Sequence, residues 1–180
     1  MKLLLTGSSG FIGQHLSPSL NKNFDLHHLK SDLLDHKAVN EEVDSVQPEI
    51  IVHLAARTEV EKSFYEQITF SEINYVGTVN LIEAASKLKN FKNFVFASTM
   101  EVYGWQPISD DVERDVIPIN HIAFDENTPP NPNAPYTVAK NTLNMLIDVT
   151  DFLSRHLDRP TVTEGKTMTS SLLNRLLRRC

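Results

Sequence analysis

The sequence has almost no cysteine and no long apolar stretch. Its only cysteine, Cys180, is the last residue, so no disulfide can form within the chain, which fits a reducing compartment. The apolar part of the opening stretch MKLLLTGSSGF is too short for a signal peptide, and no window reaches the length that spans a membrane. These absences predict a cytoplasmic protein without a membrane segment.

An excess of positive charge is also absent. The 23 acidic residues outnumber the 17 Lys and Arg residues, and the net charge of -6 is dispersed. We therefore expect neither a nucleic-acid-binding face nor a membrane-surface patch over most of the length. The seven histidines do not form a cluster with metal-ligand spacing, so we expect no metal site. A length of 180 residues with 41% hydrophobic residues allows one domain with a core, or such a domain plus an appendage.

Glycine is scarce, yet three of the six glycines stand together in LLLTGSSGFIGQHL, at positions 7, 10 and 13. The apolar run before them predicts a strand, and FIGQHLSPSL after them predicts a helix that Pro18 interrupts. A glycine turn between a strand and a helix lets the backbone approach a pyrophosphate, and the helix N-terminus offers free N–H groups to it. The stretch therefore predicts dinucleotide binding.

Other interpretations of the glycines are weaker. A phosphate loop of the Walker type needs Gly-Lys-Ser/Thr, but Gln14 and His15 follow Gly13. A nucleophile elbow needs a glycine at position 11, where the chain has Phe11. A plain tight turn remains the alternative, because a single G-x-x-G-x-x-G is not specific by itself.

Strands and helices alternate along the first 150 residues. This order predicts an α/β fold with a doubly wound parallel sheet and helices on both faces. A long proline-containing irregular stretch from about 104 to 135 precedes the last helix. The predicted strands are 2–6, 24–29, 49–56 and 93–98, and the predicted helices are 11–20, 36–46, 67–88 and one that begins near Pro135.

A second group of residues could carry acid–base chemistry. Tyr136 and Lys140 are four residues apart in PYTVAK, so on a helix they share one face. A nearby ammonium lowers the pKa of a phenol, as the positive charge of an oxidised nicotinamide would. A tyrosine of that kind can exchange a proton with a sugar hydroxyl or ketone while a hydride moves. A hydroxyl from Ser98 or Thr99, at the end of the preceding strand, would complete the site.

The combined blocks resemble the extended short-chain dehydrogenase/reductase family, which contains NAD(P)-dependent sugar-nucleotide epimerases, dehydratases and reductases. The resemblance covers about the first 150 residues and implies a Rossmann-like NAD(P)-binding fold. The blocks that carry it, in the family's order, are TGSSGFIG (6–13), SDLLD (31–35), IIVHLAA (50–56), NYVGTVNLIEAA (74–85), FASTMEVYG (96–104), DENTPPNPNAPY (125–136) and YTVAK (136–140).

The resemblance also implies a role for individual residues. Thr99, Tyr136 and Lys140 match the catalytic set, and His53 matches a buried strand residue without a catalytic role. The positions that match the cofactor site are the glycine turn and its helix start (Gly7, Gly10, Phe11, Ile12, Gly13), the adenine pair (Asp32, Leu33), the strand end beside the ribose and nicotinamide (Leu54, Ala55, Ala56), the helix asparagine Asn74, and the next strand end (Ala97, Ser98), together with Tyr136 and Lys140.

The choice between NAD and NADP stays open at this point. A carboxylate about 20 residues beyond the glycine turn usually holds the ribose hydroxyls of NAD. Counting from Gly10 reaches Lys30, whose cation could pair with the extra phosphate of NADP. Asp32 and Asp35 lie close by in the sequence, so the preference for NADP is slight.

The reaction is constrained by one departure from the family. Dehydratases of this family tend to carry an Asp-Glu pair after the catalytic threonine, but this chain has Met100-Glu101. A thioether cannot donate a proton to a leaving hydroxyl. Epimerisation or reduction of a nucleotide sugar is therefore expected ahead of dehydration.

The end of the chain also departs from the family, whose members continue into further strands and a substrate-binding lobe. We expect residues 1–158 to form an incomplete NAD(P)-binding domain that lacks this C-terminal lobe, and residues 159–180 to form an atypical basic tail. The tail is interpreted as a frame-altered or alternative ending, or as a membrane or partner contact. A non-catalytic cofactor-binding remnant or unstable fragment is thus the alternative to an enzyme, and a homodimer is expected by resemblance alone.

Overall fold

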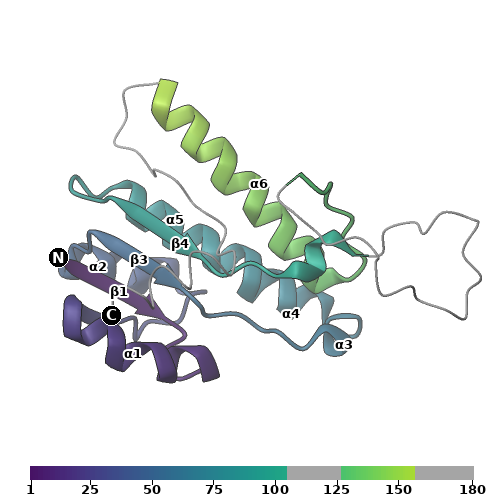
Figure 1. The fold of residues 1–180 in the computed structure, drawn as a ribbon, viewed down its shortest axis with the longest axis horizontal. Coiled ribbons are helices and arrows are strands. Elements are labelled where there is room, and N and C mark those ends of the chain that lie inside the picture. Colours follow the sequence, from purple (N-terminus) through teal and green to yellow (C-terminus); the bar gives the residue numbers. More distant parts are fainter. Residues whose placement is uncertain (105–126, 157–180) are drawn as a thin grey trace, which may run out of the picture.

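The structure is a computed structural model that describes residues 1–104 and 127–156. Strands β1 (Lys2–Thr6), β2 (Asp25–His28), β3 (Ile50–His53) and β4 (Asn93–Phe96) pair in parallel in the order β2-β1-β3-β4 (Figure 1). The helical elements are α1 (Phe11–Asn23), α2 (His36–Val46), α3 (Val60–Ser63), α4 (Gln67–Ser71), the π-helical turn η1 (Glu72–Val76), α5 (Gly77–Ser86), the 3₁₀ turn η2 (Met100–Tyr103) and α6 (Pro135–His156).

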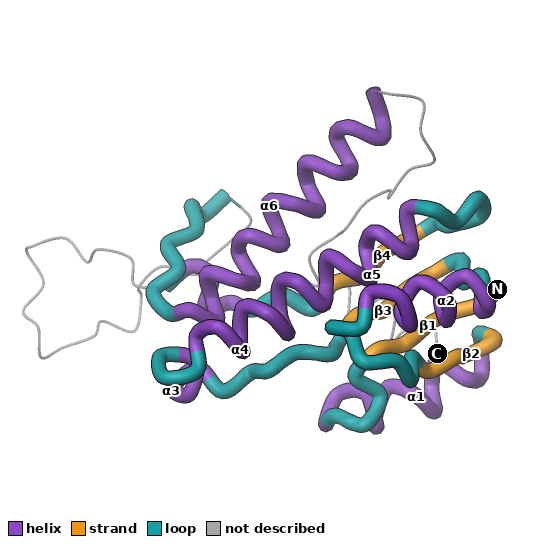
Figure 2. The backbone as a smooth tube through the Cα atoms, turned by 180° about the vertical axis from the view of Figure 1, so that it is seen from behind, coloured by secondary structure: helices purple, strands orange, loops and turns teal. Residues whose placement is uncertain are grey.

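Helices cover both faces of the sheet because its central strands are apolar on both faces. On one face, Leu3 and Leu5 of β1 pack with Leu16 and Leu20 of α1. On the other face, Leu4 belongs to a larger cluster that draws on α2, α5 and α6. Figure 2, seen from behind, shows α2, α5 and α6 on that side of the sheet, with α1 on the far side. The predicted doubly wound parallel sheet is confirmed, and this arrangement is a Rossmann-like fold.

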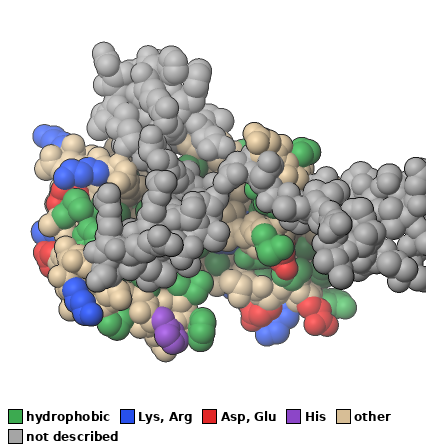
Figure 3. All heavy atoms as spheres, in the orientation of Figure 1, with side chains coloured by type: hydrophobic (Ala, Val, Ile, Leu, Met, Phe, Trp, Pro, Cys, Tyr) green, Lys and Arg blue, Asp and Glu red, His purple; other side chains and the backbone are tan. Residues whose placement is uncertain are grey.

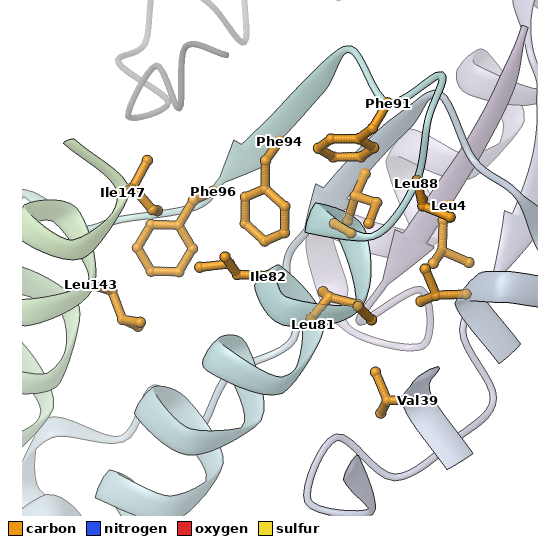
Figure 4. Packing of buried hydrophobic residues seen from close by; sticks show 14 residues of the cluster. Leu4, Val39, Leu81, Ile82, Leu88, Phe91, Phe94, Phe96, Leu143 and Ile147 are labelled. Carbon is orange, nitrogen blue, oxygen red and sulfur yellow. The ribbon is translucent and has the colours of Figure 1, made fainter. Parts of the chain in front are cut away.

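The larger cluster joins α6 to the sheet. Phe94 of β4 lies over Ile82 of α5, and Phe96 of β4 lies beside Leu143 and Ile147 of α6 (Figure 4). Burying one such side chain stabilises a fold by about 1.5–3 kcal/mol. The contact fixes the start of α6 beside the carboxyl end of β4, where Tyr136 and Lys140 lie.

Helix α1 differs from the prediction at Pro18. The sequence predicted an interruption there, but α1 continues through Pro18 to Asn23. Proline removes one backbone hydrogen bond from a helix. The burial of Leu16 and Leu20 against the sheet, on either side of Pro18, outweighs that loss.

The predicted helix 67–88 is present, but it contains the π-helical turn η1 and ends at Ser86. A π turn adds a residue to one helical turn and so rotates the faces of the helix before and after it. As a result, the apolar side chain of Val76 is 43% exposed, while the polar residues Asn74 and Thr78 are buried. Thr78 contacts His53 of β3, and Asn74 contacts Arg57 in the segment that follows β3.

On the face drawn in Figure 3, the visible acidic and basic side chains of the described residues are interspersed.

No helix within residues 1–104 and 127–156 combines the length and the hydropathy needed to cross a membrane. The proposed tail, residues 159–180, and most of the predicted irregular stretch lie outside the described residues.

Candidate active site

The glycine turn is dictated in part by the protein's own packing. Gly7 has a φ of +69°, and a Cβ on it would lie 2.6 Å from the backbone nitrogen of Ala55. A Cβ on Gly13 would lie 2.2 Å from the backbone oxygen of Gly7. Both distances are far below contact, so these two positions require glycine to bring α1 against β1 and β1 against the segment after β3.

Gly10 is different, because the chain's own packing restricts it less than Gly7 and Gly13. Its nearest contact for a Cβ is the Gly7 oxygen at 3.3 Å. Gly10 is the N-cap of α1 and makes no side-chain cap, and the following Phe11 and Ile12 are 80% and 49% exposed. The first N–H groups of a helix lack intrahelical partners and carry the positive end of its dipole. The amino end of α1 therefore fits a pyrophosphate group.

A buried hydrogen-bond chain links β1, β3 and α5 behind this turn. Thr78 donates its hydroxyl hydrogen to the backbone oxygen of Asn74 at 2.6 Å, so its own oxygen accepts from Nε2–H of His53 at 2.8 Å. Nδ1 of His53 is then an acceptor, and the Thr6 hydroxyl donates to it at 2.6 Å. The Thr6 oxygen in turn accepts from the backbone N–H of Ala55 at 3.1 Å. Burial, together with the charge of Lys140, lowers the pKa of His53 to about 3, so its ring is neutral.

Asn74 fixes the segment that follows β3. Its side-chain amide donates to the backbone oxygen of Arg57 at 2.9 Å and accepts from the backbone N–H of Arg57 at 2.8 Å. This two-point contact and the Thr6 contact to Ala55 hold Leu54, Ala55 and Ala56 in place beside Gly7. The residues that sequence reasoning assigned to the strand end therefore border the glycine turn.

The second predicted group lies at the carboxyl end of β4. Lys140 donates to the backbone oxygen of Ala97 at 2.9 Å, and its Nζ lies 4.4 Å from the centre of the Phe96 ring. One turn further along α6, Asn144 donates to the Ser98 hydroxyl at 3.0 Å. Tyr136 is only 6% exposed and shares a hydrogen bond with Thr99. Tyr136, Lys140 and Asn144 thus lie along one face of α6, against residues 97–99.

Local sequence explains why α6 begins where it does. Pro135 occupies the first helical position, where its missing N–H costs nothing. The Thr137 hydroxyl accepts from the backbone N–H of Ala134 at 3.0 Å and donates to the Ala134 oxygen at 2.8 Å. These contacts fix the first turn and hence the orientation of Tyr136.

The expected lowering of the tyrosine pKa is wrong for the protein's own groups. Burial raises the pKa of Tyr136, the Thr99 hydrogen bond opposes that effect, and the charge of Glu101 adds to it. Burial also lowers the pKa of Lys140 to about 8. The prediction assumed that the ammonium would act on the phenol, but in the structure it is hydrogen bonded to Ala97. Tyr136 is therefore protonated at neutral pH and has a proton to donate.

The end of β2 contains the remaining predicted residues. The Asp32 carboxylate accepts from the backbone N–H of Leu34 at 2.9 Å, which closes a local turn. Leu33 packs closely on Gly77, because a Cβ placed on Gly77 would lie 2.9 Å from the Leu33 Cβ. The backbone oxygen of Leu33 accepts from the side-chain amide of Asn80 at 2.8 Å. The backbone N–H of Lys30 donates to Glu42, while the Lys30 side chain is exposed.

The structure brings the predicted residues to one edge of the sheet, the carboxyl ends of β1 to β4. Sequence reasoning missed Thr6, Thr78, Asn144 and Glu42. Asn144 could have been found, because it continues the four-residue spacing of Tyr136 and Lys140. No cluster of three or more metal-ligating side chains occurs within the described part of the chain. A hollow of about 570 Å³ between α4, η1 and the start of α6, lined in part by Tyr75 and Val138, contains none of the predicted site residues.

Comparison with known proteins is consistent with this geometry. Residues 3–151 match the model of the NAD dependent epimerase/dehydratase family. The chain belongs to this family. The family assignment agrees with the resemblance inferred from the sequence blocks.

Individual relatives share the same part of the chain. The chain is 32% identical over 166 residues to dTDP-D-glucose 4,6-dehydratase of Dictyostelium discoideum, covering 77% of this chain and 38% of that protein. The structure of dTDP-4-dehydrorhamnose reductase from Bacillus anthracis in complex with NADP matches with a TM-score of 0.68 at 25% identity, over 83% of this chain and 50% of that one. UDP-glucose 4-epimerase of Thermus thermophilus in complex with NAD has a TM-score of 0.70 at 24% identity, over 88% of this chain and 52% of that one, and shows the shared fold. The chain spans about half the length, or less, of the relatives it matches.

Proposed function

We propose that the chain is the cofactor-binding part of an NAD(P)-dependent enzyme that acts on a nucleotide-linked sugar. The observation that carries this proposal is the placement of Tyr136 and Lys140 at the end of β4, on the same sheet edge as the glycine turn. In this fold a dinucleotide binds across the carboxyl ends of the strands. The pyrophosphate would be held by the backbone at Gly7, Gly10 and Gly13.

Each residue of the site has a definite task in the proposed reaction. A bound nicotinamide would supply or accept the hydride. Tyr136 would give a proton to the sugar oxygen in reduction and take one in oxidation, and its raised pKa favours the donor role at neutral pH. Thr99 would hold the phenol through its hydrogen bond, and Lys140 would keep its charge beside the site below about pH 8.

Epimerisation or reduction is the preferred reaction. Both need only the proton of the tyrosine and the hydride, whereas dehydration needs an additional acid for the leaving hydroxyl. Met100 follows Thr99 and is 70% exposed, and its thioether has no proton to donate. The similarity to an NADP-bound reductase structure supports the same choice.

Dehydration is the second candidate. The observation that favours it is the 32% identity to a dTDP-D-glucose 4,6-dehydratase. Glu101, the second residue of the usual acidic pair, is present and exposed. The homodimer and the cytoplasmic location stay predictions.

The test combines cofactor binding with turnover. Purified protein is titrated with NADH and NADPH by reduced-cofactor fluorescence, and is then assayed on a panel of nucleotide sugars and their keto forms. The Tyr136→Phe variant should keep cofactor affinity within about twofold and lower turnover by about 100-fold or more. It loses the proton donor but keeps the buried ring.

The outcomes separate the alternatives. Failure of both cofactors to bind would contradict the proposal outright. Binding without turnover on any sugar nucleotide would favour a non-catalytic remnant. Loss of water from a nucleotide hexose, with no epimer or reduced product, would select the dehydratase.

A further inference from the structure

A carboxylate from α2 occupies the turn that follows β2. Glu42 accepts from the backbone N–H of Lys30 at 2.9 Å through one oxygen and from that of Ser31 at 2.8 Å through the other. The hydroxyl of Ser31 donates to the same carboxylate at 2.5 Å. Hydrogen bonds to an ionised carboxylate are short and strong, and three of them fix the position of this charge.

We propose that Glu42 makes this chain select NAD over NADP. The inference rests on the proposed function, which takes a nicotinamide dinucleotide as the ligand, and it names which of the two is bound. In strand–helix–strand dinucleotide folds, the ribose that carries the extra phosphate of NADP lies over the end of the second strand. The negative charge of Glu42 stands at that end.

The donors at this turn are those that a phosphate would use. Backbone N–H groups and a hydroxyl at a strand end form a typical anion-binding group. In this chain they already bind Glu42, so the 2′-phosphate of NADP could use them only by displacing the carboxylate. The ribose hydroxyls of NAD carry no charge and need no such displacement.

The positive charge of Lys30, which favoured NADP in the sequence, is compensated at this turn by the negative charge of Glu42. Burial raises the pKa of Glu42, but the hydrogen bonds from Ser31 and from the two backbone N–H groups, together with the charge of Lys30, outweigh it and lower the pKa below its usual value. Glu42 is therefore ionised at neutral pH. Residues 30–35 together with Glu42 contain one lysine, Lys30, and three carboxylates, those of Asp32, Asp35 and Glu42. A doubly charged phosphate would be repelled by this set.

The experiment measures the affinities of NADH and NADPH by fluorescence titration, and those of 5′-AMP and adenosine 2′,5′-bisphosphate by competition. The unaltered chain should bind NADH and 5′-AMP about tenfold tighter than their phosphorylated counterparts. Glu42→Gln keeps the side-chain size and an acceptor oxygen but removes the charge. It should tighten NADPH binding about five- to tenfold and leave NADH binding within about twofold, as expected for removing one like charge several ångströms away.

The chain offers a matched control on the same helix. Glu41 is 68% exposed on its side chain and pairs only loosely with Lys37, at 3.7 Å. Glu41→Gln removes the same charge without touching the turn after β2, and it should leave the ratio of the two affinities unchanged. Increasing the salt concentration should narrow the gap between NADH and NADPH in the unaltered chain, because salt screens repulsion.

The results separate this inference from the proposed function. Equal affinity for NADH and NADPH in the unaltered chain would overturn the role of Glu42, whether or not the variant folds. So would a Glu42→Gln variant that binds NADPH no better, or a Glu41→Gln variant that shifts the ratio equally. If neither cofactor binds, the proposed function itself fails.

Discussion

The two ends of the candidate site are built by opposite means. At β1, the turn depends on the absence of side chains at Gly7 and Gly13, because Cβ atoms added there would meet backbone at 2.6 and 2.2 Å. At β4, Tyr136, Lys140 and Asn144 place polar groups in or beside a buried interface with residues 97–99. The first region is defined by steric fit and the second by the desolvation of polar side chains.

This difference predicts opposite responses to mutation. A side chain added at Gly7 or Gly13 would overlap the backbone and must displace the main chain. At β4, replacing a polar side chain by an apolar one of similar size removes a desolvation cost and also removes function. Between them, His53 tests a third case, a buried polar group whose hydrogen bonds are satisfied on both ring nitrogens.

The largest expected effect is at Gly13. Gly13→Ala should lower the free energy of unfolding by about 3 kcal/mol or more, because its Cβ would lie 2.2 Å from the Gly7 oxygen. Gly10→Ala should cost less than about 1 kcal/mol, since the nearest atom is 3.3 Å away. Urea denaturation of the two variants measures the difference. Equal costs would show that packing does not distinguish the two glycines.

The next effect is a pH dependence that originates at His53. Its pKa is about 3 in the folded chain, against 6.5 for a solvent-exposed histidine, so the unfolded chain binds a proton first as the pH falls. The stability contributed by the neutral His53 ring is therefore fully present above pH 6.5. Below that pH, the free energy of unfolding falls by about 1.4 kcal/mol per pH unit because of His53. His53→Gln removes this titration. Between about pH 7 and about pH 5, the free energy of unfolding of the variant should therefore fall by ~2 kcal/mol less than that of the unaltered chain. An unchanged slope in the variant would refute a neutral buried histidine.

The smallest expected effect has the opposite sign. Lys140 has a pKa of about 8 in the folded chain, against 10.5 for a solvent-exposed lysine, so its burial as a cation costs stability below pH 8. That cost disappears as the pH rises from 8 to 10.5, because the folded chain loses its proton before the unfolded chain does. Lys140→Met should therefore raise the free energy of unfolding at neutral pH by about 1–2 kcal/mol, after allowing for the lost bond to Ala97.

Thermal and urea unfolding near neutral and alkaline pH measure this gain. The variant should lose most of its advantage over the unaltered chain as the pH approaches the upper end of the window. A variant that is less stable at every pH would mean that the contacts of Lys140 with Ala97 and Phe96 outweigh its desolvation. Such a result would remove the contrast between the two ends of the site.

Much of the fold was predictable because it depends on local pattern. The apolar run before Gly7 and the period of the helices specify buried strands and amphipathic helices wherever they occur. The spacing also predicted that Gly7 and Gly13 lie in a turn between a strand and a helix, and that Tyr136 and Lys140 share one face of a helix. The continuous helix through Pro18 and the π turn at Glu72–Val76 were not predictable, because they involve packing and hydrogen bonds with parts of the chain distant in sequence.

The sequence by itself determined which chemical groups the protein has and the order in which they occur: a glycine turn, a tyrosine and lysine one helical turn apart, and a methionine where an acid would stand. Only the tertiary structure decided the state of those groups. The raised pKa of Tyr136, the neutral ring of His53 and the carboxylate of Glu42 at the end of β2 all depend on residues distant in the chain. Desolvation and hydrogen-bond partners are set by what packs against a group, and no local pattern contains that information.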